Sequence, residues 1–108
     1  MTTQQRRIGQ FTVSSVGLGA MPFSMSDKPE KPAEEQAIAT VHAALDAGVT
    51  LIDTADIYAP SWDSMGHNER IVAKALRSYN GDTSNVVVAT KAGITRSEGE
   101  RWGRDSAP

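Results

Sequence analysis

Hydrophobic and polar positions change their spacing along this chain, and each spacing predicts a different element. Apolar residues alternate loosely around Gly9 between residues 6 and 15, which predicts a short hairpin. Residues 15–20 form a small apolar run with two glycines, which predicts a strand that another backbone approaches closely. Residues 21–31 mix prolines, serines and charges, and this composition predicts a loop.

Two amphipathic stretches then predict helices. The first begins at Pro32, because proline suits the first helical turn and the two glutamates that follow complement its positive end. Gly48 suits the left-handed residue that ends such a helix. The second helix is expected over residues 68–79, and the Asn-Gly pair at 80–81 ends it. The apolar positions of the first recur at three- and four-residue steps: Ala37, Ile38, Val41, Ala44 and Leu45.

Each predicted helix is followed by an apolar run that is too short for a further helix. These runs, residues 49–52 and 85–91, predict strands, and the three valines at 86–88 are typical of a strand buried on both faces. The resulting order β-α-β-α-β favours a parallel sheet with right-handed crossovers. From residue 92 onward the chain is rich in Gly, Arg and Ser without periodicity, which predicts a loop and no further element.

Composition narrows the class of protein. The chain has 108 residues, of which 39% are hydrophobic and 22% charged, so we expect one globular domain over residues 1–108. A net charge of -2 gives no electrostatic case for nucleic acid or an anionic membrane. No run approaches the roughly 18 apolar residues of a membrane span. The absence of cysteine and of a signal-type apolar start fits a cytoplasmic protein.

Polar side chains follow two of the predicted strands. Asp53 comes directly after residues 49–52, Lys91 ends residues 85–91, and Tyr58 lies five positions after Asp53. Parallel neighbours end at one edge of a sheet about 4.8 Å apart, which is where ligands bind in α/β folds. A lysine beside a phenol stabilises the phenolate, and a carboxylate keeps the lysine charged and oriented, which suits proton transfer near neutral pH. The alternatives without chemistry are that Asp53 caps a turn, that Tyr58 only packs and that Lys91 is solvated.

Several short segments occur together in one order along the chain. They are VSSVGLGAM at 13–21, AALDAG at 43–48, LIDTADIY at 51–58, NE at 68–69 with AKAL at 73–76, and VATKAG at 88–93. Jointly they resemble the N-terminal third of the aldo-keto reductase family, in family order and at family-like spacing.

The resemblance implies an α/β fold, the (β/α)8 TIM barrel, and an enzyme that reduces aldehydes and ketones with NADPH. By this resemblance Tyr58 is the proton donor to the carbonyl oxygen, Lys91 assists it, and Asp53 orients Lys91 and reaches the nicotinamide ribose. No metal site is implied. The resemblance also implies that the loop after the first strand borders the nicotinamide, namely Gly19, Ala20 and Met21.

The chain also departs from the family pattern. The family's catalytic histidine follows the next strand, and neither His42 nor His67 occupies that position. The family's phosphate and adenine contacts come from its last strands, and a complete barrel needs about 250 residues. We therefore expect a fragment with an N-terminal hairpin, roughly three strands and two helices. We expect it to bind cofactor poorly, turn over little, and self-associate through exposed barrel edges.

Two other classes of function remain open alongside the carbonyl reductase. One is a non-catalytic family member that acts as a binding or regulatory subunit, and the other is a self-sufficient small α/β binding module. Trp62 is either an aromatic contact for substrate or a residue packed on a neighbouring loop. Residues 96–104 are expected to be a solvated loop without a ligand, and no role is assigned to Asp56.

Overall fold

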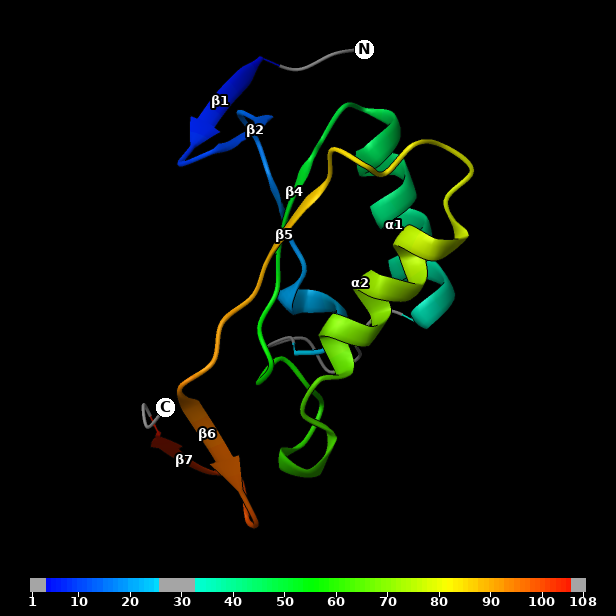
Figure 1. Ribbon diagram of the computed structural model, residues 1–108. Helices are drawn as coiled ribbons and strands as arrows, with labels where there is room; N and C mark the ends of the chain where they lie inside the picture. The colour runs from blue at the N-terminus through cyan, green and yellow to red at the C-terminus, as the bar shows by residue number, and fades with distance from the viewer. Residues whose placement is uncertain (1–3, 26–32, 106–108) are drawn as a thin grey trace.

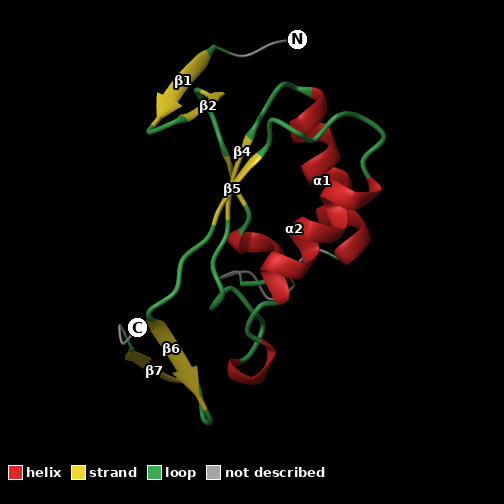
Figure 2. Cartoon of the chain, in the orientation of Figure 1, coloured by secondary structure: helices red, strands yellow, loops and turns green. Residues whose placement is uncertain are grey.

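Three small sheets follow one another along the molecule (Figure 1). The structure, a computed structural model, describes residues 4–25 and 33–105. A hairpin lies at one end, a parallel sheet with both helices on one side lies in the middle, and a second hairpin lies at the far end (Figure 2).

The middle sheet confirms the predicted β-α-β-α-β order. Its strands β3 (Leu18–Gly19), β4 (Leu51–Asp53) and β5 (Val87–Ala89) are parallel neighbours in that order. The strands are shorter than predicted, with two residues in β3 and three each in β4 and β5. Gly17, just before β3, lies close to the next strand: a Cβ there would be 3.1 Å from the carbonyl oxygen of Leu51, which explains the glycine.

Both predicted helices are present, as α1 (Glu34–Asp46) and α2 (His67–Ser78). The expected start at Pro32 lies outside the described residues. Gly48 has φ 96°, which confirms the left-handed position just beyond the end of α1. The helices pack on each other and on Ile52 of β4, and bury a core that also includes Ala20, Phe23, Ala37, Val41, Leu45, Ile71, Val72 and Ala75.

His42 links the two helices rather than facing the strand ends. Its Nε2 lies 2.8 Å from the carbonyl oxygen of Ala75, so this nitrogen carries the proton and donates it. The ring also lies against Tyr79, with 5.4 Å between ring centroids. These two contacts make His42 a packing residue between the helices.

The predicted loop of residues 21–31 contains a short helical turn. Met21–Phe23 forms a 3₁₀ turn (η1) with a proline in its first positions, and the Phe23 side chain enters the core. A proline with its fixed φ suits the first turn of a helix, which explains why the chain turns here. Residues 26–32 lie outside the described part of the chain.

The expectation that the valine strand is buried on both faces is wrong. Val88 is 40% exposed, although its register partner Ile52 is fully buried. Strand β5 pairs only with β4 among the described residues, and α1 and α2 cover one side of the sheet (Figure 1). An edge strand therefore leaves this apolar side chain partly in solvent.

The N-terminal hairpin was predicted and the C-terminal one was not. Strands β1 (Gln5–Ile8) and β2 (Phe11–Ser14) confirm the first. The expected loop after residue 92 is wrong, because β6 (Ile94–Ser97) and β7 (Arg101–Arg104) form an antiparallel pair. Two consecutive residues with positive φ, Gly99 at 81° and Glu100 at 59°, reverse the chain between them.

Candidate active site

The carboxyl ends of β4 and β5 bring Asp53 and Lys91 together. Asp53 pairs with Ala89 in the sheet, and the ladder continues when the Thr54 N–H donates to the Ala89 carbonyl oxygen at 2.8 Å. Lys91 Nζ then donates to Asp53 Oδ1 at 2.8 Å and to the Thr54 carbonyl oxygen at 2.7 Å. Both charged side chains are about half exposed, at 50% for Lys91 and 52% for Asp53, so a ligand at this edge can reach them.

The charge of Lys91 is reinforced by its neighbours. The hydrogen bond that Lys91 donates to Asp53 is the main reason that the pKa of Lys91 is raised above its ordinary value of 10.5. Partial burial opposes this shift, while the charge of Asp53 and the nearby Tyr58 add to it. Lys91 is therefore an ammonium group at neutral pH.

Tyr58 completes the group of residues predicted from the sequence. The Lys91 Nζ lies 5.2 Å from the centroid of the Tyr58 ring, within the range of a cation–π contact. The Tyr58 backbone is bonded on both sides, since its N–H donates to the Ala55 carbonyl oxygen at 3.3 Å and its carbonyl accepts from the Asn68 N–H at 3.1 Å. The phenol, the ammonium and the carboxylate thus lie at one edge of the sheet.

A small cavity of about 120 Å³ opens beside these residues. Most of its wall is apolar, and one Asp56 carboxylate oxygen is buried without a hydrogen-bond partner in the described part of the chain. The cavity is lined by Ala55, Asp56, Ile57, Tyr58, Lys91, Ala92 and Ile94.

The three residues expected to border a nicotinamide lie on the neighbouring strand end. Gly19 is paired with Asp53, and Met21 is exposed. Apart from its chain neighbours, no described residue has an atom within 4 Å of where a Cβ on Gly19 would be. Ala20 is fully buried: its N–H donates to the Asp53 carbonyl oxygen at 2.9 Å, and its own carbonyl accepts from Phe23 and Asn68. Ala20 thus fixes the loop, while Gly19 leaves open space, Met21 is exposed and Asp53 adds a half-exposed carboxylate at the same edge.

Asn68 is a site residue whose importance the sequence did not reveal. It is fully buried and joins three segments of the chain. The Thr54 hydroxyl donates to its Oδ1 at 2.6 Å, and its Nδ2 donates to the Ala20 carbonyl oxygen at 2.7 Å and to Ser24 Oγ at 2.9 Å. A buried amide with this many partners fixes the loops after β3 and β4 to the start of α2. The available signal was an asparagine beside the apolar face of that helix.

Arg96 is the second residue that was missed, and the expectation of a solvated loop around it is wrong. It is 9% exposed, and its Nη1 donates to the carbonyl oxygens of Ile57 at 3.0 Å and Ala59 at 2.8 Å. Its Nη2 forms an ion pair with Glu100, and the guanidinium lies 4.9 Å from the centroid of the Trp102 ring. The signal was an arginine with a glutamate four residues later and a tryptophan six residues later across a glycine turn.

Glu100 also reaches the loop that carries Tyr58. The Trp62 N–H donates to Glu100 Oε1 at 2.7 Å, so part of this tryptophan's environment is the neighbouring hairpin. The hydrogen bond from Arg96, followed by the one from Trp62, lowers the pKa of Glu100 below its ordinary value of 4.5. The carboxylate is therefore charged over the neutral range.

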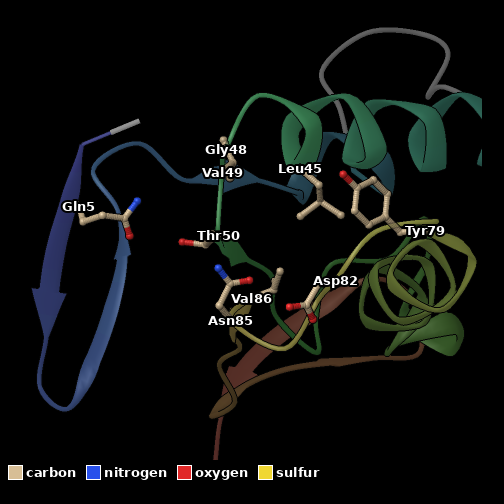
Figure 3. A pocket seen from close by; sticks show the side chains of 9 residues that line it. All are labelled: Gln5, Leu45, Gly48, Val49, Thr50, Tyr79, Asp82, Asn85 and Val86. Carbon is tan, nitrogen blue, oxygen red and sulfur yellow. The ribbon is translucent and has the colours of Figure 1, made fainter. Parts of the chain in front are cut away.

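A larger cavity of about 240 Å³ lies at the opposite ends of the strands (Figure 3). Thr50 precedes β4 and Val86 precedes β5, and Gln5 of β1 faces the same space. Tyr79 lines this cavity, and its hydroxyl donates to Asp46 Oδ1 at 2.6 Å. This hydrogen bond is the main reason that the pKa of Tyr79 is raised. None of the predicted site residues lies there.

Parallel strands with helices on one side, and charged groups at the carboxyl ends of the strands, are the arrangement found in a segment of an α/β barrel. The chain matches the model of the aldo/keto reductase family over residues 15–107, and it belongs to this family. It is 30% identical over 103 residues to the uncharacterized oxidoreductase C215.11c of Schizosaccharomyces pombe. That match covers 94% of this chain and 31% of C215.11c. It is 44% identical over 61 residues to the aldo-keto reductase YhdN of Bacillus subtilis, or 56% of this chain and 17% of YhdN.

A solved structure supports the same assignment. The holo form of the aldo-keto reductase AKR11C1 from Bacillus halodurans is similar to this chain with a TM-score of 0.71 and 30% identity. The match covers 95% of this chain and 30% of that one. The chain thus spans about a third of the length of AKR11C1 and of C215.11c, both of which match nearly all of it. Within residues 4–25 and 33–105, none of the helices has the length and apolar character needed to cross a membrane.

Proposed function

We propose that this chain contributes the catalytic edge of an NADPH-dependent reductase that converts aldehydes or ketones to alcohols. The observation that carries the proposal is the contact of Lys91 with both Asp53 and Tyr58 at the carboxyl ends of adjacent parallel strands. A charged lysine beside a phenol supports proton donation by the phenol. Lys91 and Asp53 are also half exposed, so a substrate can reach them, which a purely structural contact would not require.

Each residue has a definite task in this proposal. Tyr58 gives its proton to the carbonyl oxygen as that oxygen gains negative charge, and Lys91 stabilises the phenolate that remains. Asp53 holds the lysine by the 2.8 Å hydrogen bond and offers its second oxygen to the ribose of the cofactor. When bound, NADPH supplies the hydride to the carbonyl carbon. The cavity beside Tyr58 admits the reacting end of the substrate.

The test compares two tyrosines in a complete barrel that contains this segment. Tyr58→Phe is expected to lower kcat by about 10²- to 10⁴-fold, the usual contribution of a general acid, while the Kd for NADPH changes little. Tyr79→Phe is the matched control, because this tyrosine bonds Asp46 at the opposite end of the sheet. Equal kcat values for Tyr58→Phe and the unchanged protein would overturn the proposed role.

For the 108-residue chain alone we propose weak cofactor binding and self-association. The chain covers 31% of C215.11c, and the outer sides of β3 and β5 have no strand partner among the described residues. Exposed Val16 and Val88 add apolar surface near these edges. An NADPH titration by fluorescence, with light scattering on the same samples, checks both expectations. Tight binding with turnover of an aromatic aldehyde would contradict them.

A cysteine-free chain suits a reducing compartment, and we propose that the protein works in the cytoplasm. No observation in the described residues favours the non-catalytic family member over the enzyme. The Tyr58→Phe comparison separates the two, because a purely binding or regulatory subunit has no carbonyl turnover for the substitution to lower.

A further inference from the structure

Three successive carbonyl groups around Tyr58 accept hydrogen bonds from outside their own loop. The Tyr58 carbonyl accepts from the Asn68 N–H at 3.1 Å, at the start of α2. The carbonyls on either side, Ile57 and Ala59, both accept from Nη1 of Arg96, at 3.0 and 2.8 Å. One guanidinium nitrogen therefore spans the residue that carries the phenol, and it comes from a hairpin 37–39 residues away in the sequence.

Arg96 is itself held firmly. Glu100 pairs with its Nη2, and the Trp102 ring lies 4.9 Å from the guanidinium on the neighbouring strand. The same Glu100 carboxylate accepts the Trp62 N–H at 2.7 Å, a few residues beyond the carbonyls that Arg96 bonds. The hairpin thus contacts the loop at three backbone positions, all through the Arg96–Glu100 pair.

The burial of Arg96 is the second observation on this contact. Arg96 is 9% exposed, and taking a guanidinium out of water is costly unless its donors are used. Two of its donors go to loop carbonyls and one goes to Glu100, while Nε is buried without a partner among the described residues. A hairpin that only needed to fold could leave this side chain in solvent, as Arg101 does. A planar fork can bond two carbonyls and a carboxylate at once, which an ammonium group cannot do with the same geometry.

We propose that Arg96 is a positioning residue that holds the Tyr58 ring beside Lys91. The inference rests on the proposed role of Tyr58 as proton donor for its catalytic consequence, but not for the positioning itself. Without the two flanking hydrogen bonds the Tyr58 backbone keeps its contacts to Ala55 and Asn68 and gains freedom to shift, so the ring samples positions away from the lysine.

The positioning is tested first on the 108-residue chain by spectroscopy. The chain has two tyrosines, so a Tyr79→Phe background labelled with ¹³Cζ-tyrosine gives one resonance, that of Tyr58. We expect Arg96→Met to displace and broaden this resonance, and Arg101→Met, an exposed arginine of the same hairpin, to leave it unchanged. An unmoved Tyr58 resonance in a folded Arg96→Met chain would overturn the proposal.

A second variant keeps the test decisive if Arg96→Met fails to fold by circular dichroism. Arg96→Lys retains the charge and a donor but cannot bond both carbonyls and Glu100 with the same geometry. We expect a smaller displacement of the Tyr58 resonance in the same direction. No displacement in a folded Arg96→Lys chain would equally overturn the positioning role.

The catalytic consequence is measured separately in a complete barrel that contains this segment. We expect Arg96→Met to lower kcat by about 10- to 100-fold, with less than about a threefold change in KM, because a small misplacement of a reacting group acts on the transition state. In a Tyr58→Phe background the same substitution should cause no further loss. Full turnover by Tyr58→Phe would overturn the proposed function, and the tyrosine resonance would still decide whether Arg96 positions that residue.

Discussion

The buried amide of Asn68 gives a sharp test of how the site is held together. Its side chain accepts from the Thr54 hydroxyl at 2.6 Å and donates to the Ala20 carbonyl at 2.7 Å and to Ser24 Oγ at 2.9 Å. Asn68→Ala removes all three bonds at once from a fully buried position. We expect this substitution to destabilise the chain strongly while a comparable change on the surface does not.

The expected magnitude follows from the partners that remain. The Thr54 hydroxyl loses the acceptor at a fully buried position, which costs about 1–3 kcal/mol. Ala20 keeps the bond from the Phe23 N–H and Ser24 keeps its contact with His67, so each of those losses is nearer the net value of about 0.5–1.5 kcal/mol. The free energy of unfolding should therefore fall by about 2–6 kcal/mol, a large share of the ~5–15 kcal/mol typical of a domain.

Urea unfolding followed by circular dichroism and by tryptophan fluorescence measures this change, provided that the two transitions coincide. Asn80→Ala is the control, since Asn80 is exposed beyond α2 and its loss should cost less than about 0.5 kcal/mol. A value for Asn68→Ala within 0.5 kcal/mol of the control, on the order of ordinary surface changes, would refute the reasoning that this amide joins the three segments.

Three further predictions follow from single contacts. The pKa of Glu100 is lowered on folding, so its ion pair with Arg96 stabilises the protein above pH 4.5, and this stabilisation is lost as the pH falls through the lower folded pKa. The emission of Trp62 should change in that acid range, and an emission that stays constant there would contradict the pairing. Gly48→Ala places a side chain at φ 96° and should cost about 1 kcal/mol by urea unfolding, with no cost if the residue can leave that conformation. Ile71→Ala should cost about 2–5 kcal/mol because Ile71 is 3% exposed in the core, and a loss below 1 kcal/mol would mean that the site collapses around the deletion.

Local signals predicted the central part of the fold well. Periodic apolar positions and Gly48 gave α1 nearly to its ends, since the helix runs Glu34–Asp46 and the glycine has φ 96°. Chain order then placed Asp53 and Lys91 at the same sheet edge, and their side chains meet at 2.8 Å. Such predictions succeed because periodicity and strand order are properties of neighbouring residues or of simple topology.

Contacts between distant segments were not predictable in the same way. Strands β6 and β7 are rich in arginine and contain only two large apolar residues, Ile94 and Trp102, which is too few for a strand periodicity. The hairpin is held by its backbone pairing, a cross-strand contact and a turn. The exposure of Val88 depends on which elements cover β5, which a run of valines does not encode.

The sequence by itself determined two amphipathic helices, three parallel strands in order, and the edge at which a carboxylate, a lysine and a tyrosine are gathered. Only the tertiary structure decided that Arg96 is buried and bonds the carbonyls beside that tyrosine, and that Asn68 joins the loops around it. The physical reason is that a polar side chain is buried only where partners from distant segments converge on it. That convergence leaves no repeating pattern along the chain.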